Sequence, residues 1–149
     1  MREAFTQTLL HILDLAQREA RDHRQEFVGT EHLFLAVISC ETCEAVNILR
    51  QQHLDPAALR SSVMGELPVA GEMPVITGDL PLSPKAQRVI NGAIVKAQAL
   101  REPRISTRFL LLSLLDEPHT VIRVAINAGG EDVNQLRQAL VDTPENIEQ

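Results

Sequence analysis

Residues 28–36 read VGTEHLFLA, and residues 105–113 read ISTRFLLLS, 77 positions further along the chain. The same offset, without a gap, aligns residues that are identical or similar in character over most of both halves. Examples are Phe5-Thr6 with Leu82-Ser83, Ala16 with Ala93, Asp55 with Asp132, and Leu59-Arg60 with Leu136-Arg137. A constant offset over such a span indicates one supersecondary unit used twice. The repeat therefore constrains the fold more than any local motif does.

The bulk composition is typical of one globular domain with an aliphatic core. The chain has 149 residues, of which 44% are hydrophobic, but it has only four phenylalanines and no tryptophan or tyrosine. A chain of this length buries most of its apolar surface. The sequence has no apolar run near twenty residues and no signal-peptide pattern. We therefore expect a cytoplasmic protein that does not enter a membrane.

The charge balance and the short motifs weigh against two classes of function. A net charge of −6 argues against a nucleic-acid binder, whose affinity would rest on neutralising phosphates. Neither lysine, Lys85 or Lys96, follows a glycine, so there is no Walker A motif and the chain is not itself an ATPase. We expect protein partners, no cofactor and a monomer.

Helical periodicity and capping residues predict four helices in each half, and no segment alternates with period two. In the first half they run from Thr6 to near Arg24, from Thr30 to Cys40, from about Thr42 to Gln52, and from Asp55 through Val63. In the second half they run from Ser83 to about Leu100, from Ser106-Thr107 through Leu115, from about His119 to Ala128, and from Asp132 through Leu140. The predicted fold is all-α, an eight-helix bundle of two pseudo-symmetric four-helix repeats.

The second helix of each half is apolar almost all round, which predicts that it is central in the bundle. Residues 1–149 are interpreted as a single domain. Its first repeat spans about 5–64 and its second about 82–141. Residues 65–81 read GELPVAGEMPVITGDLP, a connector whose Val69, Val75 and Ile76 can lie against the bundle. The polar, acidic tail covers 142–149 and is expected to fray.

Four strings together resemble the N-terminal domain of Clp-type AAA+ unfoldases of the ClpA and ClpC kind, without their ATPase modules. They are Phe5-Thr6, AQREA at 16–20, VGTEHLFLA at 28–36 and LSPKA at 82–86. The similarity covers about residues 5–141. It implies a compact pseudo-two-fold bundle that binds protein substrates and Clp adaptor proteins, serves a Clp ATPase ring and has no catalytic activity.

The resemblance also implies candidate binding residues. Some family members recognise phosphoarginine-tagged proteins through the Thr that opens each repeat and the Glu of the Gly-Thr-Glu-His string. These positions correspond here to Thr6 and Glu31 in the first half, and to Ser83 and Arg108 in the second. Arg108 is a departure from the family pattern, since a guanidinium stands where a carboxylate would bind one. The site around Arg108 in the second half is therefore expected to favour an acidic group. The binding surfaces we predict are a patch around Thr6 and Glu31 and an apolar groove between the halves.

Each candidate also has a structural explanation. Glu31 complements the dipole at the start of a helix, and Thr6 and Ser83 are good N-caps. His32 lies beside a leucine run and is expected to pack or form hydrogen bonds within the bundle. Cys40 and Cys43 form a C-x-x-C without the second ligand pair that zinc needs, so we interpret them as two incidental thiols with no metal.

Two other classes of function stay open at this level. A helix-turn-helix DNA-binding regulator also consists of short helices joined by tight turns, although the acidic balance and the unbroken repeat weigh against it. An enzyme is the other class, but nothing in the sequence assembles a site for one. The sequence does not decide whether these residues act alone or as part of a longer protein.

Overall fold

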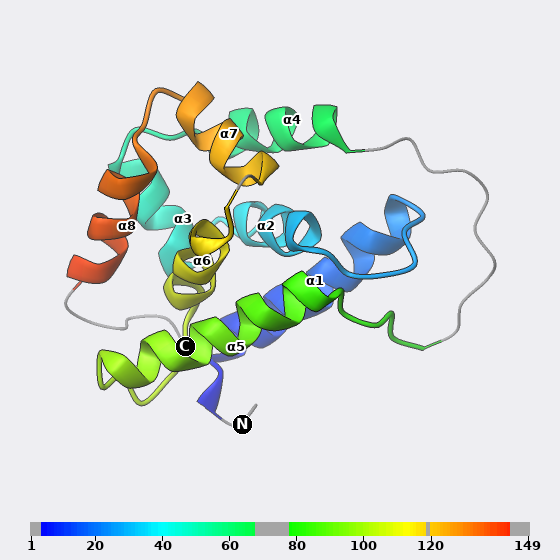
Figure 1. The fold of residues 1–149 in the computed structure, drawn as a ribbon, viewed down its shortest axis with the longest axis horizontal. Helices are drawn as coiled ribbons and strands as arrows, with labels where there is room; N and C mark the ends of the chain where they lie inside the picture. Colours follow the sequence, from blue (N-terminus) through cyan, green and yellow to red (C-terminus); the bar gives the residue numbers. More distant parts are fainter. Residues whose placement is uncertain (1–3, 68–77, 119, 144–149) are drawn as a thin grey trace.

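The computed structural model describes residues 4–67, 78–118 and 120–143, which form eight helices and two isolated β-bridges (Figure 1). The helices are α1 (Gln7–Asp22), α2 (Thr30–Ser39), α3 (Glu44–Gln51), α4 (Pro56–Glu66), α5 (Pro84–Ala99), α6 (Thr107–Asp116), α7 (Val121–Ala128) and α8 (Val133–Asp142). The predicted all-α fold of two four-helix repeats is confirmed. The connector residues Val69, Val75 and Ile76, residue His119 and the tail from 144 lie outside the described residues.

Side-chain caps start four of the eight described helices at the residues that the sequence predicts. Thr6 Oγ1 accepts a hydrogen bond from the Leu9 N–H at 3.0 Å, and Ser83 Oγ accepts one from the Ala86 N–H at 3.1 Å. Asp55 and Asp132 cap α4 and α8 in the same way. Such caps satisfy backbone donors that have no partner inside the helix.

Three predicted boundaries were wrong. Gly29, not Thr30, is the N-cap of α2, and Thr30 is instead its buried first residue. α3 begins at Glu44 because the Cys43 thiol, rather than Thr42, takes the cap and accepts from the Val46 N–H at 3.4 Å. α4 continues through Glu66, so the first residues of the expected connector are helical.

The helix ends repeat with the same 77-residue offset. α1 and α5 stop at Asp22 and Ala99, two residues before Arg24 and Arg101, whose φ angles of 55° and 58° are left-handed. The N–H that follows each of them bonds back five residues at 2.9 Å, from Gln25 to Ala20 and from Glu102 to Ala97. This is the Schellman pattern, which satisfies carbonyls at the end of a helix.

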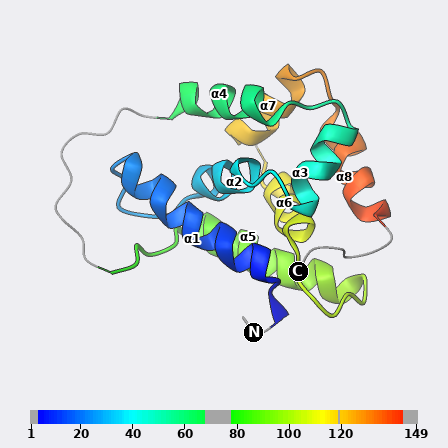
Figure 2. The same ribbon diagram turned by 180° about the vertical axis from the view of Figure 1, so that it is seen from behind.

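The central helices are α2 and α6, as predicted. All residues of α6 from Thr107 to Leu115 are buried, and so are most of those in α2. Figures 1 and 2 show both helices between the α1–α5 pair on one side and α4 with α7 on the other. Helices that are covered on several sides need apolar residues around their whole circumference.

The two repeats are joined by backbone pairing, in which the first segment of each repeat pairs with the segment before the central helix of the other. The residue before α1's cap, Phe5, forms a parallel bridge with Ile105 before α6, and Leu82 before α5 forms one with Val28 before α2. The Thr6 N–H donates to the Ile105 carbonyl at 3.0 Å, and the Ser83 N–H donates to the Val28 carbonyl at 2.9 Å. The start of each repeat therefore lies against the central helix of the other repeat.

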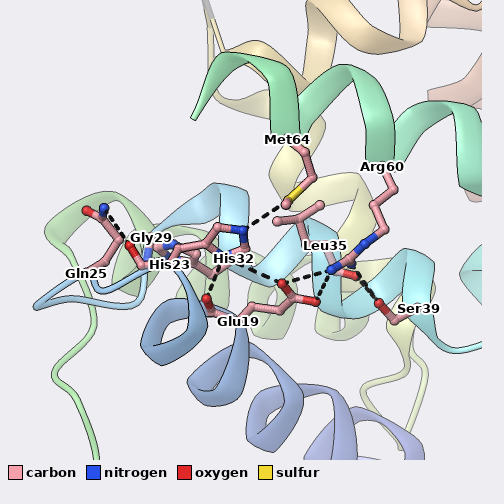
Figure 3. Close-up of polar contacts among 9 residues, drawn as sticks. All are labelled: Glu19, His23, Gln25, Gly29, His32, Leu35, Ser39, Arg60 and Met64. Atoms are coloured by element: carbon pink, nitrogen blue, oxygen red, sulfur yellow. Dashed lines mark hydrogen bonds and ion pairs between the residues drawn. The ribbon is translucent and has the colours of Figure 1, made fainter. Parts of the chain in front are cut away.

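His32 holds the start of α2 in place. Its Nδ1 accepts the Gly29 N–H at 2.9 Å, and its ring is buried 6.1 Å from the ring of His23 (Figure 3). An accepting Nδ1 requires the proton on Nε2 and hence a neutral ring. Burial lowers the pKa of His32 from its ordinary value of 6.5, and His23 adds to this effect while Glu31 and Glu19 oppose it.

We expect His32 to make folding stability depend on pH. A lowered folded-state pKa means that the unfolded chain binds the proton more readily. The neutral ring therefore stabilises the fold above its unfolded-state pKa of about 6.5, and this contribution is lost as pH falls through the folded-state value. The melting temperature of the wild type should fall more between pH 7 and pH 5 than that of His32→Gln. The glutamine amide oxygen can accept the hydrogen bond but does not titrate. Parallel losses in both proteins would contradict this role.

Candidate functional site

The backbone pairing between the repeats places Glu31 beside Ser83, at one end of the domain. A cavity of about 560 Å³ lies between the start of α2 and the start of α5. Its lining comes from both repeats: Gln25, Phe27, Gly29, Thr30, Glu31, His32, Ser83, Pro84, Lys85 and Arg88. Two of the four predicted site residues are thus brought together here. We call this cavity the Glu31–Ser83 site.

Glu31 carries the negative charge of the site. Its carboxylate is half-buried in the first turn of α2 and makes no ion pair or side-chain hydrogen bond among the described residues. A Cβ atom at Gly29 would lie 2.8 Å from Glu31 Oε2. Glycine at this position therefore leaves room for the carboxylate to fold back towards the helix N-terminus, where negative charge is favourable.

Positive charge faces Glu31 from α5. Lys85 is exposed in the first turn of α5. Arg88 also lines the cavity, but it forms an ion pair with Glu117 at 3.3 Å. The N-terminus of α2 contributes the positive end of its helix dipole. The site thus places cationic and anionic groups within one cavity, an arrangement suited to a ligand that carries both charges.

An apolar rim borders these charges. Phe27 is 51% exposed, although aromatic side chains of this size are mostly buried in a folded domain. Ser83 adds a hydroxyl whose oxygen already accepts the Ala86 N–H. His32 closes the wall of the cavity as a buried neutral ring, and its role in packing and hydrogen bonding is as predicted.

The predicted patch around Thr6 and Glu31 does not exist. Thr6 lies against Ile105 at the opposite end of the domain, and none of its surface is exposed. The two residues are in the same repeat, but each repeat places its first segment on the other one. Thr6 is therefore close to Arg108 in the fold, and Glu31 to Ser83.

Arg108 is a buried residue rather than a surface cation. Its side chain is 1% exposed, and its guanidinium pairs with Glu44 at 2.8 Å and with Glu102 at 3.3 Å. It also donates to the Leu140 carbonyl at 2.8 Å and lies 4.3 Å from the centroid of the Phe109 ring. The acidic group expected at this end is thus supplied by the chain itself.

A groove of about 350 Å³ does lie between the halves, between α1 and α5, but polar groups make up more of its lining than apolar ones, so the predicted apolar character was wrong. The half-buried Leu13 and Ile90, which the repeat offset relates, line it together with Leu33 and Leu82. Asp14 and Asp79 add carboxylates to its lining. Val28 and Leu82 line this groove, and their chain neighbours Gly29 and Ser83 line the Glu31–Ser83 site, so the two cavities are adjacent.

The part of the chain that the structure describes contains neither a cluster of metal-binding side chains nor a single helix that could span a membrane. No three His, Cys, Asp or Glu side chains gather there in a way that could hold a metal ion. Cys43 is a buried helix cap and Cys40 a half-buried neighbour, both with free thiols. No single described helix is long and apolar enough to cross a membrane; only α2 and α3 taken together, bent by 80°, reach the required length and composition.

Sequence reasoning missed Glu44, Glu102, Phe27 and Lys85. The repeat offset contains a signal for Glu102, because it aligns neutral Gln25 with Glu102 just as it aligns Glu31 with Arg108. Two charge changes of opposite sign at one end point to an ion pair. No comparable signal exists for Glu44, which comes from a helix far away in the sequence.

Comparison with known proteins identifies the fold and the family. The family model of the Clp repeat N-terminal domain matches residues 4–107 and 81–149. The chaperone protein ClpC1 of Arabidopsis thaliana chloroplasts is 32% identical over 149 residues, covering 99% of this chain but 16% of that protein. ClpC1 of Oryza sativa subsp. japonica is 30% identical over 141 residues, covering 95% and 15%. The chain thus spans about one sixth of these relatives.

Solved structures with the same fold include N-terminal domains of several chaperones. The Hsp104 domain of Candida albicans superposes with a TM-score of 0.79 at 16% identity, covering 97% of this chain and 95% of that one. A ClpV N-domain in complex with a VipB peptide gives 0.73 at 14% identity, covering 96% and 91%. With the family model matching from residue 4 to residue 149, these eight helices belong to the Clp repeat N-terminal domain family.

Proposed function

We propose that this domain is a non-catalytic recognition module of the Clp unfoldase and protease system. It captures substrate proteins or adaptors for an ATPase carried on another module or chain. The observation that carries the proposal is the Glu31–Ser83 site, where an exposed lysine and a half-buried carboxylate with no ion pair among the described residues line one cavity built from both repeats. The ClpV N-domain that binds a VipB peptide has the same fold, which supports peptide binding here.

Arginine-phosphorylated proteins are the substrate class that the charges of the site favour. A phosphoarginine carries a guanidinium and an anionic phosphoryl group side by side. The Glu31 carboxylate suits the guanidinium, because charge-assisted Arg–carboxylate hydrogen bonds are strong. The N-terminus of α2 and Lys85 suit the phosphoryl group, since free N–H groups and positive charge at a helix start bind phosphates.

The α1–α5 groove is a second contact surface for the same function. Leu13 and Ile90 offer half-buried apolar area to an unfolded segment, and Asp14 and Asp79 complement basic residues in it. A peptide held at the Glu31–Ser83 site by a modified arginine can continue into this groove, because Gly29 and Ser83 of the site directly follow Val28 and Leu82 of the groove.

Glu31→Gln should weaken capture of a synthetic phosphoarginine peptide by about tenfold or more, because a hydrogen bond to a charged group contributes about 1.5–3 kcal/mol. Calorimetric titration measures the affinity, and Glu41→Gln is the matched control, since Glu41 is exposed and does not line the site. Equal losses in both variants, or no loss in Glu31→Gln, would contradict the assignment.

Lys85→Ala should distinguish the contribution of the phosphoryl group to binding from that of the guanidinium. It should reduce affinity for the phosphoarginine peptide and leave the weak binding of the same peptide with plain arginine nearly unchanged. The loss should shrink at high salt, because Lys85 is exposed and its charge is screened. An equal effect on both peptides would show that Lys85 does not contact the phosphoryl group.

Ile90→Asn should weaken binding of a permanently unfolded protein, such as reduced and carboxymethylated α-lactalbumin, because it places an amide among the apolar side chains of the groove. Val95→Asn is the control on the same helix, since Val95 is 62% exposed and lies outside the groove. Fluorescence anisotropy compares the two variants. A wild type that binds neither this protein nor the phosphoarginine peptide, a Clp ring or an adaptor would overturn the proposed function.

A further inference from the structure

The two ends of the domain are built alike but carry opposite charges. At one end Glu31 follows the cap of α2 and faces Ser83; at the other Arg108 occupies the equivalent position and Thr6 the position of Ser83. The Glu31 end is open, and most of its lining residues are half-buried or exposed, although Thr30 and His32 are buried. At the Arg108 end, Thr6, Ser106, Thr107 and Arg108 are all buried.

The Arg108 guanidinium is held as a bound ligand would be. It contacts Glu44 of α3, Glu102 of the loop between α5 and α6, and the carbonyl of Leu140 in α8. The Phe109 ring lies against it, 4.3 Å from the guanidinium carbon to the ring centroid, within the range of a cation–π contact. These groups come from separate elements and converge on one planar cation.

The carboxylates in this cluster require a cation. Glu44 is 3% exposed and Glu102 is 18% exposed at the side chain, so water screens neither charge fully. Removing one partner of a buried ion pair leaves an uncompensated charge, which is strongly unfavourable. A planar guanidinium satisfies several acceptors at once, whereas an ammonium offers a point charge. The cluster is therefore specific for a guanidinium.

We propose that the Arg108 end is a guanidinium-binding cavity that the chain fills with its own arginine, so that the domain presents one external recognition site rather than two. The guanidinium-binding cavity is inferred from the contacts of Arg108 alone. The inference of a single external recognition site rests on the proposed function, because it takes the Glu31–Ser83 site as that external site. Arg108 thus acts as an intramolecular ligand that occupies the guanidinium position at the second end, although a cavity of about 570 Å³ lined by Glu44 lies beside it.

Chemical rescue of Arg108→Ala tests the cavity. The variant should melt well below the wild type, and millimolar methylguanidinium should raise its melting temperature by about 3 °C or more relative to equal methylammonium, because a ligand that binds only the folded state stabilises it. Wild type and Arg50→Ala, which removes an exposed arginine of α3, should show no such difference between the two salts. If the variant is unfolded at all temperatures, the same comparison is made on its folded fraction by circular dichroism.

Equal effects of methylguanidinium and methylammonium on the melting temperature or the folded fraction of Arg108→Ala would contradict the proposed guanidinium-binding cavity. A second measurement uses the unmodified protein. Phenylglyoxal, which reacts with accessible guanidinium groups, should modify Arg88 and Arg104 and leave Arg108 intact, as read by mass spectrometry. Modification of Arg108 at the rate of Arg88 would show that this end is open.

Calorimetric stoichiometry tests the count of external sites. One phosphoarginine peptide should bind per domain, and Glu31→Gln should leave no second binding event. Two equivalents bound to the wild type would overturn the single-site inference and leave the proposed function intact. No binding at all would count against the proposed function, and the rescue and modification experiments would still decide whether Arg108 fills the cavity.

Discussion

The paired backbone segments that cross between the repeats are the constraint on which the rest of this domain depends. Val28 pairs with Leu82 and Phe5 with Ile105, so each repeat delivers its first cap to the central helix of the other. The four hydrogen bonds of these pairings are 2.8–3.0 Å long and fix the starts of α1, α2, α5 and α6. The domain consequently has two composite ends, and neither end can form from one repeat alone.

Identical architecture at the two ends makes the charge difference between them informative. At one end, the glycine before Thr30 leaves space for the Glu31 carboxylate, and no other described side chain neutralises it. At the other end, Arg108 is neutralised by Glu44 and Glu102 and is closed off from solvent. The half-buried Glu31 carboxylate has no side-chain partner among the described residues and is therefore available to a ligand, whereas the buried and paired Arg108 belongs to the fold.

The sequence predicted the parts of the fold that depend on local chemistry. The caps Thr6, Ser83, Asp55 and Asp132 and the two central helices follow from capping preferences and apolar periodicity. The offset of 77 residues predicted two equivalent halves but could not show that their first segments are exchanged, because a repeat aligned with itself contains no information about pairing between copies. Thr6 and Glu31 were therefore assigned to one patch although they lie at different ends.

Long-range contacts account for the other failures. Glu44 reaches Arg108 across 64 positions, and nothing local to either residue indicates the pair. Capping propensity does not decide between Gly29 and Thr30, because glycine and threonine are about equally favoured as N-caps. In the fold, Thr30 is buried as the first residue of α2, and the His32 ring binds the Gly29 N–H instead. Tertiary packing therefore selects the cap of α2.

The central claim is that recognition takes place at a composite site formed by the start of α2 from one repeat and the start of α5 from the other. Two-dimensional amide NMR of the labelled domain during titration with a phosphoarginine peptide tests it most directly. The account predicts the largest shifts in Gly29–His32 and in Ser83, Lys85 and Ala86 together, with Thr6 and Thr107–Phe109 unmoved. Shifts centred on Thr6 and Arg108, or confined to one repeat, would contradict it.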